Sequence, residues 1–331
     1  MTKKEIYSLI ILILVLGYGF YRYEHRNYTA KEARILMDTV FEITASSQDK
    51  NIKSAVDSTF EMISRYENRL SEYKKGSYIW NINHSNEETF PMDPDVYAML
   101  TITDSLYKAS HSMLDVSIGA VSSLWDFDNA KLPNPDSLKK ALKLVDFSKI
   151  RYDKKTLHKP KGMQLNFGCI AKGYVVDKAV DYLQSHGATS GVVDCRSSIR
   201  IFGKQKEPFV VGIQHPRKMN EVIGELSLND QSIGTSGDYQ QFFELKGKRY
   251  HHILDPHTGY PHENTISVTV IAPNATWADG LSTALFVMDP TEAINYAKEL
   301  PNTEAVIYYL SKDGIVSLKT AGMKDILKEK L

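Results

Sequence analysis

Short runs rich in β-branched and aromatic residues recur along the chain, and turn residues bound most of them. This pattern predicts β-strands over residues 40–44, 191–195, 198–202, 209–213, 266–271 and 304–309. Lys246-Gly247 and Asp313-Gly314 lie between pairs of apolar runs, and such dipeptides are typical of tight hairpin turns. The second half of the chain is therefore expected to form antiparallel sheet.

Other segments repeat apolar residues at the 3.6-residue spacing of an amphipathic helix. They are 52–66, 172–186 and two segments that begin at Asp93-Pro94 and Asp289-Pro290, where an aspartate caps the helix and a proline opens its first turn. Helices and strands alternate irregularly, so the predicted fold class is α+β, with mixed and antiparallel sheets and packed helices. Residues 28–331 are expected to form a single domain, since no low-complexity linker, repeat or long charge block divides them.

The N-terminal segment has a different composition from the rest. Its run from Ile6 to Tyr21 holds 16 uncharged residues and is rich in Leu and Ile. A helix of that length spans about 24 Å, and flanking aromatic and basic residues would extend it toward the ~30 Å of a bilayer core. No small-x-small cleavage site follows, so residues 1–27 are interpreted as a signal-anchor, with a cleaved signal peptide and a buried helix as the alternatives.

Charge and cysteine content exclude several classes of protein. Lys plus Arg and Asp plus Glu both number 40, and no basic stripe interrupts this balance, so no nucleic-acid partner is expected. The chain of 331 residues is 42% apolar and 24% charged, which is ordinary for a globular protein. Cys169 and Cys195 have no CxxC partner, which excludes a zinc cage and leaves one disulfide open.

Gly168-Cys-Ile-Ala-Lys-Gly173 lies where a strand is expected to pass into a helix. Glycines allow a ligand to approach the backbone closely, a new helix offers free amide donors, and Lys172 can neutralise a phosphate. The segment is not a Walker A motif. By itself it is equally compatible with a tight turn that carries a solvated lysine.

Asp279 and Thr283 are spaced i and i+4 within Trp277-Ala-Asp-Gly-Leu-Ser-Thr-Ala284, which is interpreted as the first turns of a helix. A carboxylate and a hydroxyl on one helix face are hard oxygen ligands, better suited to Mg²⁺ than to zinc. The plainer alternative is that Asp279 favours the helix N-terminus and Thr283 faces the core.

Two further segments carry polar groups with turn chemistry. In His251-His-Ile-Leu-Asp-Pro-His-Thr-Gly-Tyr-Pro261, alternation on a strand places His251 and His252 on opposite faces, so one functional histidine is expected rather than a shared metal. Gly234-Thr-Ser-Gly-Asp-Tyr239 is interpreted as a small-residue turn that meets a polar ligand or serves only as a loop.

Taken together, these segments resemble the ApbE-like FAD:protein FMN transferases over about residues 30–325. Any one match is weak, but eight of them occur in the order found in the family. The matching segments are 36–39, 70–73, 113–115, 168–177, 212–217, 235–239, 252–261 and 278–284.

The resemblance implies a reaction in which FAD is cleaved at its pyrophosphate, FMN is joined to a Thr or Ser of a flavoprotein, and AMP leaves. It implies that Mg²⁺ is held by Asp279, Thr283 and the carbonyl of Ala171. The group that positions the incoming hydroxyl would be His252 or the nearby carboxylate of Asp255, with Lys172 assisting catalysis. The residues implied to contact FAD are Met37, Tyr73, Met113, Leu114, Asp115, Lys172, Asp177, His252 and Ile253.

The resemblance also implies an acceptor flavoprotein subunit of a membrane redox complex, and a domain held on the periplasmic side by the N-terminal helix. The chain departs from the family pattern at Arg196-Ser197, where two glycines are usual, and at Ser112, where glycine is usual. The exchange at Arg196-Ser197 is expected to remove glycine's freedom at positive φ. An FAD-binding protein without transfer activity, which this exchange favours, and a Mg²⁺-dependent FAD pyrophosphatase remain alternative functions.

Overall fold

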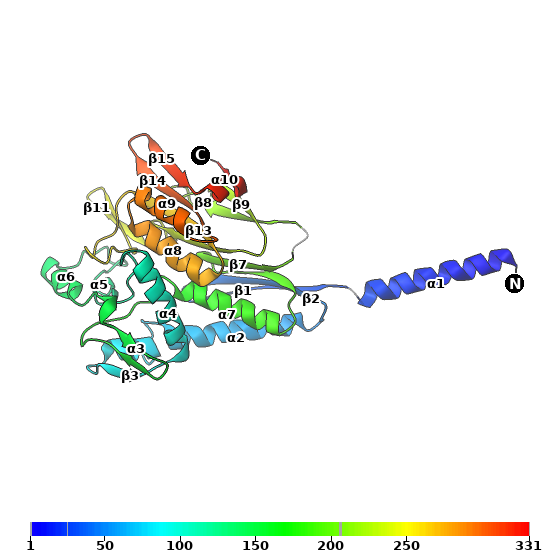
Figure 1. Ribbon diagram of the computed structural model, residues 1–331, viewed down its shortest axis with the longest axis horizontal. Coiled ribbons are helices and arrows are strands. Elements are labelled where there is room, and N and C mark those ends of the chain that lie inside the picture. Colours follow the sequence, from blue (N-terminus) through cyan, green and yellow to red (C-terminus); the bar gives the residue numbers. More distant parts are fainter. Residues whose placement is uncertain (1, 25, 205–206, 331) are drawn as a thin grey trace.

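A computed structural model describes residues 2–24, 26–204 and 207–330. Its central element is an eight-stranded sheet in which every neighbouring pair is antiparallel (Figure 1). The strand order is β1 (Tyr28–Leu36), β2 (Thr39–Ser47), β6 (Ser190–Asp194), β7 (Ser198–Gly203), β10 (Ser232–Gly237), β13 (Thr265–Ala272), β14 (Glu304–Ser311) and β15 (Gly314–Lys319).

Four helices pack against one face of this sheet. Their apolar sides enclose two buried clusters, one centred on Phe41, Phe60 and Val176, and the other on Val270 and Leu285. These helices are α2 (Ile52–Leu70), α7 (Ala171–Ser185), α8 (Ala275–Val287) and α9 (Pro290–Glu299).

A small sheet of β16 (Leu327–Glu329), β9 (Val222–Leu228) and β8 (Phe209–Gln214) covers the other face. Ile201, Ile233 and Leu226 are buried between the two sheets. The short helix α10 (Ala321–Ile326) connects the last strand of the large sheet to β16.

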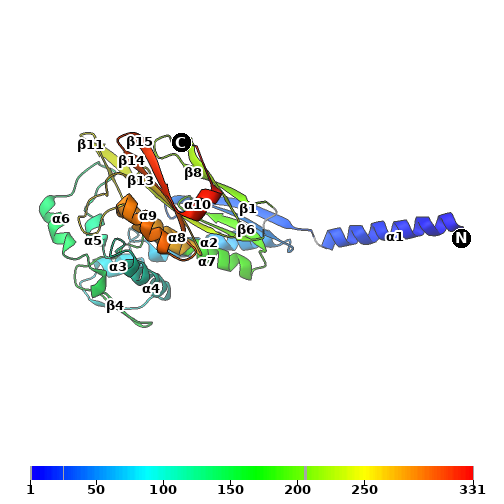
Figure 2. The same cartoon turned by 45° about the horizontal axis from the view of Figure 1, so that its top comes forward.

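The remaining elements form a lobe at the end of the molecule farthest from the N-terminus (Figure 2). Leu100, Phe147 and Leu165 are buried in it, in a cluster continuous with the core beneath α8. Its elements are α3 (Tyr78–His84), β3 (Thr89–Pro91), α4 (Pro94–Ala109), α5 (Gly119–Ser122), α6 (Pro135–Leu142), β4 (Arg151–Tyr152), β5 (Thr156–His158), β11 (Phe242–Leu245) and β12 (Lys248–His251), with a 3-10 turn at Phe147–Lys149.

Helix α1 (Lys3–Glu24) extends away from the rest of the chain (Figure 1). Its 22 residues span about 33 Å at 1.5 Å per residue. The segment Lys3–Tyr23 has a mean hydropathy of 1.6 and is not buried against the protein. It is therefore long and apolar enough to cross a membrane, a test that a signal sequence also passes.

The structure confirms the α+β class and the four helices expected from periodicity. Asp93 and Asp289 cap α4 and α9 through backbone N–H groups, as expected. The Lys246-Gly247 turn has positive φ at both residues (52° and 76°), which suits a tight hairpin. Both cysteines are free thiols, so the disulfide left open by the sequence is not formed.

One expectation was only partly right. Most of the segment Gly234–Tyr239 is strand rather than turn, because Ser232–Gly237 forms β10 in the middle of the large sheet, and the chain turns only at Asp238 and Tyr239. A Cβ at Gly234 would lie 2.2 Å from the carbonyl oxygen of Ala278. Glycine at this position thus allows α8 to lie directly against β10, and this close contact accounts for a strand that looked like a loop.

Candidate functional site

The N-terminal turn of α7 is joined to α8 at Gly173. The Gly173 N–H donates to Asp279 Oδ2 at 2.8 Å. A Cβ on Gly173 would lie 2.3 Å from the Ala275 carbonyl oxygen, so the two helices touch through backbone. This contact brings Ala171 and Lys172, at the start of α7, beside the carboxylate of Asp279.

Asp279 and Thr283 share one face of α8, as their spacing predicted. Asp279 is only 4% exposed, and burial raises the pKa of its carboxyl group to about 6, although the charge of Lys172 and the Gly173 N–H act to lower it. The Thr283 hydroxyl lies 3.3 Å from the Asp279 carbonyl oxygen and 3.2 Å from the hydroxyl of Ser236 on β10. A buried carboxylate next to a fixed hydroxyl matches the hard oxygen donors that Mg²⁺ prefers.

The positive charge of Lys172 acts to lower the pKa of three neighbouring side chains, Asp279, Cys195 and His252, so these groups gather around it. Burial, together with the neighbouring His251 and the charge of Lys172, lowers the pKa of His252 to about 4. His252 is therefore neutral at pH 7. Its Nδ1 lies 3.3 Å from the Gln241 carbonyl oxygen, which can only accept, so this contact leaves the lone pair on Nε2.

A second group of acids converges from the lobe on the thiol of Cys169. Burial raises the pKa of this thiol, and Asp279, Asp115 and Glu72 all raise it further. Asp115 is buried and accepts hydrogen bonds from the Ser117 N–H, the Ser117 hydroxyl and the Phe147 N–H. Asp115 and Asp279 therefore both lie near Cys169, and Met113 and Leu114 are in the loop that precedes Asp115.

Met37 and Tyr73 lie at one end of α2. Met37 forms the β1–β2 turn, and its N–H donates to Glu67 Oε1 in the last turn of α2 at 3.0 Å. Tyr73 follows α2 and is 80% exposed, so its ring is available to a ligand.

Sequence reasoning missed Glu72, which lies next to Tyr73. Burial raises the pKa of Glu72 to about 7, and Asn166 Nδ2 donates to its Oε1 at 2.8 Å. The sequence offers no local signal for this, because Glu72 and Asn166 are far apart in the chain.

Ile253 is buried two residues after the end of β12, and Asp255 lies in the turn that follows. Asp255 Oδ1 accepts from the His257 N–H at 2.7 Å, and the Asp255 N–H donates to the Tyr260 carbonyl oxygen at 2.9 Å. This carboxylate therefore holds its own turn and faces His257.

Asp177 has its carboxylate at the N-terminus of α8. It accepts from the Ala275 N–H and the Thr276 N–H, each at 2.8 Å, and from the Thr276 hydroxyl at 2.5 Å. The structure therefore gives Asp177 a direct part in holding α8, the helix that carries Asp279.

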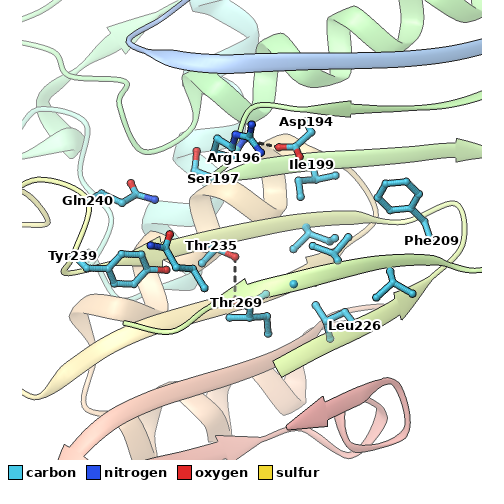
Figure 3. Close-up of a pocket in the computed structure, with 16 residues that line it drawn as sticks. Asp194, Arg196, Ser197, Ile199, Phe209, Leu226, Thr235, Tyr239, Gln240 and Thr269 are labelled. Carbon is cyan, nitrogen blue, oxygen red and sulfur yellow. Dashed lines mark hydrogen bonds between the residues drawn. The ribbon is translucent and has the colours of Figure 1, made fainter. Parts of the chain in front are cut away.

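Arg196 occupies the turn between β6 and β7 and keeps the left-handed backbone expected of glycine, with φ of 72°. The expectation that this exchange removes positive φ was therefore wrong. The Arg196 N–H donates to Asp194 Oδ1 at 2.6 Å, which closes the turn. Figure 3 shows Asp194, Arg196 and Ser197 together along one side of a cavity of about 400 Å³.

This cavity lies across the sheet from Asp279. Ile233 and Thr235 line it, whereas Gly234 between them faces α8. Successive residues of a strand point to opposite faces, so the exposed side chain of Arg196 borders a space behind the candidate site.

The model of the ApbE family matches residues 37–307 of this chain. The chain belongs to the ApbE family. Its match begins at Met37 and includes every candidate site residue named above, while α1 lies outside it.

Curated relatives of this ApbE-family chain carry one description. A protein of Treponema pallidum described as FAD:protein FMN transferase is 30% identical over 328 residues, which cover 92% of this chain and 91% of the relative. A Haemophilus influenzae protein with the same description is 33% identical over 279 residues, covering 79% of this chain and 80% of the relative.

Solved structures agree with the fold. The ApbE protein of Thermotoga maritima superposes with a TM-score of 0.84 at 28% identity, covering 91% of this chain and 100% of that one. The apo flavinyl transferase ApbE of Pseudomonas stutzeri, at 24% identity, has a TM-score of 0.79 and covers 91% of this chain and 97% of its own.

Proposed function

We propose that this ApbE-family chain is a Mg²⁺-dependent FAD:protein FMN transferase that joins FMN to a Thr or Ser hydroxyl of an acceptor flavoprotein and releases AMP. The proposal rests above all on the convergence of Lys172, His252 and Asp279. A cation, a neutral histidine and a buried carboxylate are the groups that phosphoryl transfer to a hydroxyl requires.

Asp279, Thr283 and the carbonyl of Ala171 would hold Mg²⁺. When bound, the ion neutralises charge that develops on the pyrophosphate. The donor set fits, because Asp279 is buried with a raised pKa and its ionised form gains from a nearby cation. Among the described residues no cluster of three or more His, Cys, Asp or Glu is placed to hold a metal, and a set with one carboxylate needs none.

His252 would accept the proton of the incoming hydroxyl. Its ring is neutral at pH 7 for the reason given above, so Nε2 has a lone pair that can accept this proton. Asp255 remains the alternative proton acceptor. Lys172 would draw the phosphates of FAD toward Asp279, while Met37, Tyr73, Met113, Leu114, Asp115, Asp177 and Ile253 would surround the rest of FAD.

The location of the domain is part of the same proposal. Helix α1 would anchor the chain, placing residues 28–331 on the periplasmic side, where the acceptor would be a flavoprotein subunit of a membrane redox complex. Protease added to intact spheroplasts should digest the domain. Complete protection under those conditions would refute this orientation.

The transferase assay uses the full chain in detergent with FAD, Mg²⁺ and Ser- or Thr-containing peptides from flavoprotein subunits. Transfer adds FMN less one water to the peptide and releases one AMP for each addition. Free FMN with AMP would indicate a pyrophosphatase, and bound but uncleaved FAD a binding protein.

Two histidine variants complete this test. His252→Gln should lower the transfer rate by about 10²-fold or more, the contribution typical of a general base. His186→Gln is the matched control, because His186 is exposed at the C-terminal end of α7 and stacks on Tyr182.

A further inference from the structure

Ser112, His257 and Asp255 form a serine, histidine and aspartate array next to the candidate site. Ser112 Oγ lies 3.0 Å from His257 Nε2 and 2.6 Å from the carbonyl oxygen of His111, and its hydroxyl hydrogen can rotate between these two acceptors. His257 Nδ1 lies 3.3 Å from Asp255 Oδ1. Ser112 and Asp255 are far apart in sequence, and the fold brings them together. In this arrangement a histidine can take the proton of a serine hydroxyl while a carboxylate orients the ring and stabilises the charge formed.

The backbone presents this serine to a cavity. Ser112 has φ of 63° and the preceding His111 has φ of 51°, so two residues with side chains hold left-handed conformations in succession. Such conformations are costly and are concentrated at functional sites. Ser112 and His257 line a cavity of about 250 Å³, and the side chain of His257 is 50% exposed.

The hydrogen bonds around Ser112 argue against acyl chemistry. The Ser112 N–H donates to the Tyr107 carbonyl oxygen, and the Met113 N–H donates to the Ser110 carbonyl oxygen. The Leu114 N–H donates to the Ser110 hydroxyl. An acyl-transfer site needs N–H groups aimed at a developing oxyanion, and the amides on either side of this serine are already engaged.

The carboxylates that border the cavity are held by local donors. Asp115 accepts the three hydrogen bonds described above, and Asp146 accepts from the N–H and hydroxyl of Ser148 and pairs with Lys149 at 3.2 Å. The cavity thus has an acidic wall formed by Asp115 and Asp146, whose oxygens are largely engaged by these donors.

We propose that Ser112 is an internal acceptor of FMN, and this inference rests on the proposed transferase function. Ser112 Oγ attacks the FMN phosphorus of FAD, and the bond from that phosphorus to the bridging oxygen breaks. AMP leaves with the bridging oxygen, the Ser112 proton passes to His257 Nε2, and FMN remains as a phosphodiester of Ser112. Ser112 follows α4 directly before Met113–Asp115, the segment proposed above to contact FAD.

The test is incubation of the full chain with FAD and Mg²⁺, without any acceptor peptide. Intact-mass spectrometry should find FMN less one water added once, and denatured protein should keep flavin fluorescence in a gel. Tryptic peptide 109–131 holds five serines, so fragmentation must place the flavin on Ser112.

Variants separate this role from a structural one. Ser112→Ala should abolish self-labelling, as should Ser112→Gly, which also removes the backbone strain and so controls for misfolding. His257→Gln should slow labelling by about 10²-fold or more, since Gln cannot accept the proton. Ser148→Ala is the matched control and should label normally, because Ser148 is an exposed serine nearby that bonds to Asp146 rather than to a histidine.

The outcomes distinguish the two proposals. If FMN is transferred to a peptide but Ser112 is never labelled, the internal acceptor is refuted and the transferase stands. A label on another residue, or labelling that survives Ser112→Ala, would also refute it. If FAD is not cleaved at all, both proposals fail.

Discussion

Asp177→Ala should destabilise the protein by releasing the N-terminus of α8. The Asp177 carboxylate accepts two backbone N–H bonds and one hydroxyl bond there. Each hydrogen bond to a charged group contributes roughly 1.5–3 kcal/mol, and recovery of the desolvation cost of a buried carboxylate offsets part of the sum. Burial raises the pKa of Asp177, which shows that the folded protein bears a desolvation cost for this carboxylate. The Ala variant avoids that cost, so we expect the free energy of unfolding to fall by about 2–4 kcal/mol in total.

Urea unfolding of the detergent-solubilised chain measures this loss, and the thermal midpoint should fall by about 2 °C per kcal/mol for a chain of this size. Because α8 carries Asp279 and Thr283, transfer activity should fall as well. Added Mg²⁺ should restore part of the stability, because it binds the folded arrangement of α8.

Asp289→Ala is the matched control. Asp289 caps α9 through the N–H groups of Thr291 and Glu292, at 2.9 and 3.4 Å, on an exposed helix end. Its loss should cost about 1 kcal/mol and leave transfer unchanged. If Asp177→Ala left stability unchanged and only weakened FAD binding, the capping argument would be wrong and Asp177 would act through FAD alone.

Three further changes have defined outcomes. Gly234→Ala should cost about 3 kcal/mol in urea unfolding, because the new Cβ would meet the Ala278 carbonyl oxygen at 2.2 Å; a cost under about 1 kcal/mol would contradict the tight β10–α8 contact. Asp279→Asn should abolish transfer. Without metal, however, this variant should be more stable at pH 7 than the wild-type chain by roughly 1–3 kcal/mol. The folded pKa of about 6 lies above the unfolded value, so ionisation opposes folding as pH rises through 4 to 6, and the difference should vanish near pH 4. Arg196→Gly should raise stability by about 1 kcal/mol through relief of positive φ, with FAD affinity unchanged and transfer unchanged or higher; loss of FAD affinity would show that Arg196 belongs to the ligand site.

Local signals in the sequence predicted those parts of the fold that local physics controls. Periodicity and caps located α2, α4, α7 and α9, because each helix carries its own apolar face and start signal. β1 was not predicted, since it is an edge strand whose pattern is largely polar. β10 was mistaken for a turn because its Gly234 serves the contact with α8, which no local rule describes.

In the candidate site too, local spacing could be predicted from the sequence, whereas long-range contacts could not. The i and i+4 spacing of Asp279 and Thr283 was readable from the sequence, but the burial that raises the pKa of Asp279 depends on α7 and β10. The contact of Asp177 with Ala275 joins residues 98 positions apart, and that of Asn166 with Glu72 joins residues 94 apart. Neither contact leaves a pattern in a single sequence.

The three turns that border the site share a backbone feature that the sequence conceals. Met37, Ser112 and Arg196 all have positive φ, although none is glycine. Each such residue costs on the order of 1–3 kcal/mol and persists only where neighbouring contacts hold it. Those contacts are present: the Met37 N–H bonds to Glu67, the Ser112 N–H to Tyr107, and the Thr39 hydroxyl bonds to the Cys195 carbonyl oxygen, which links the first turn to the third. Glycine would remove the strain at all three positions. At Met37 and Ser112, which lie beside the proposed FAD site, the side chains are best explained by what they present to a ligand rather than by stability.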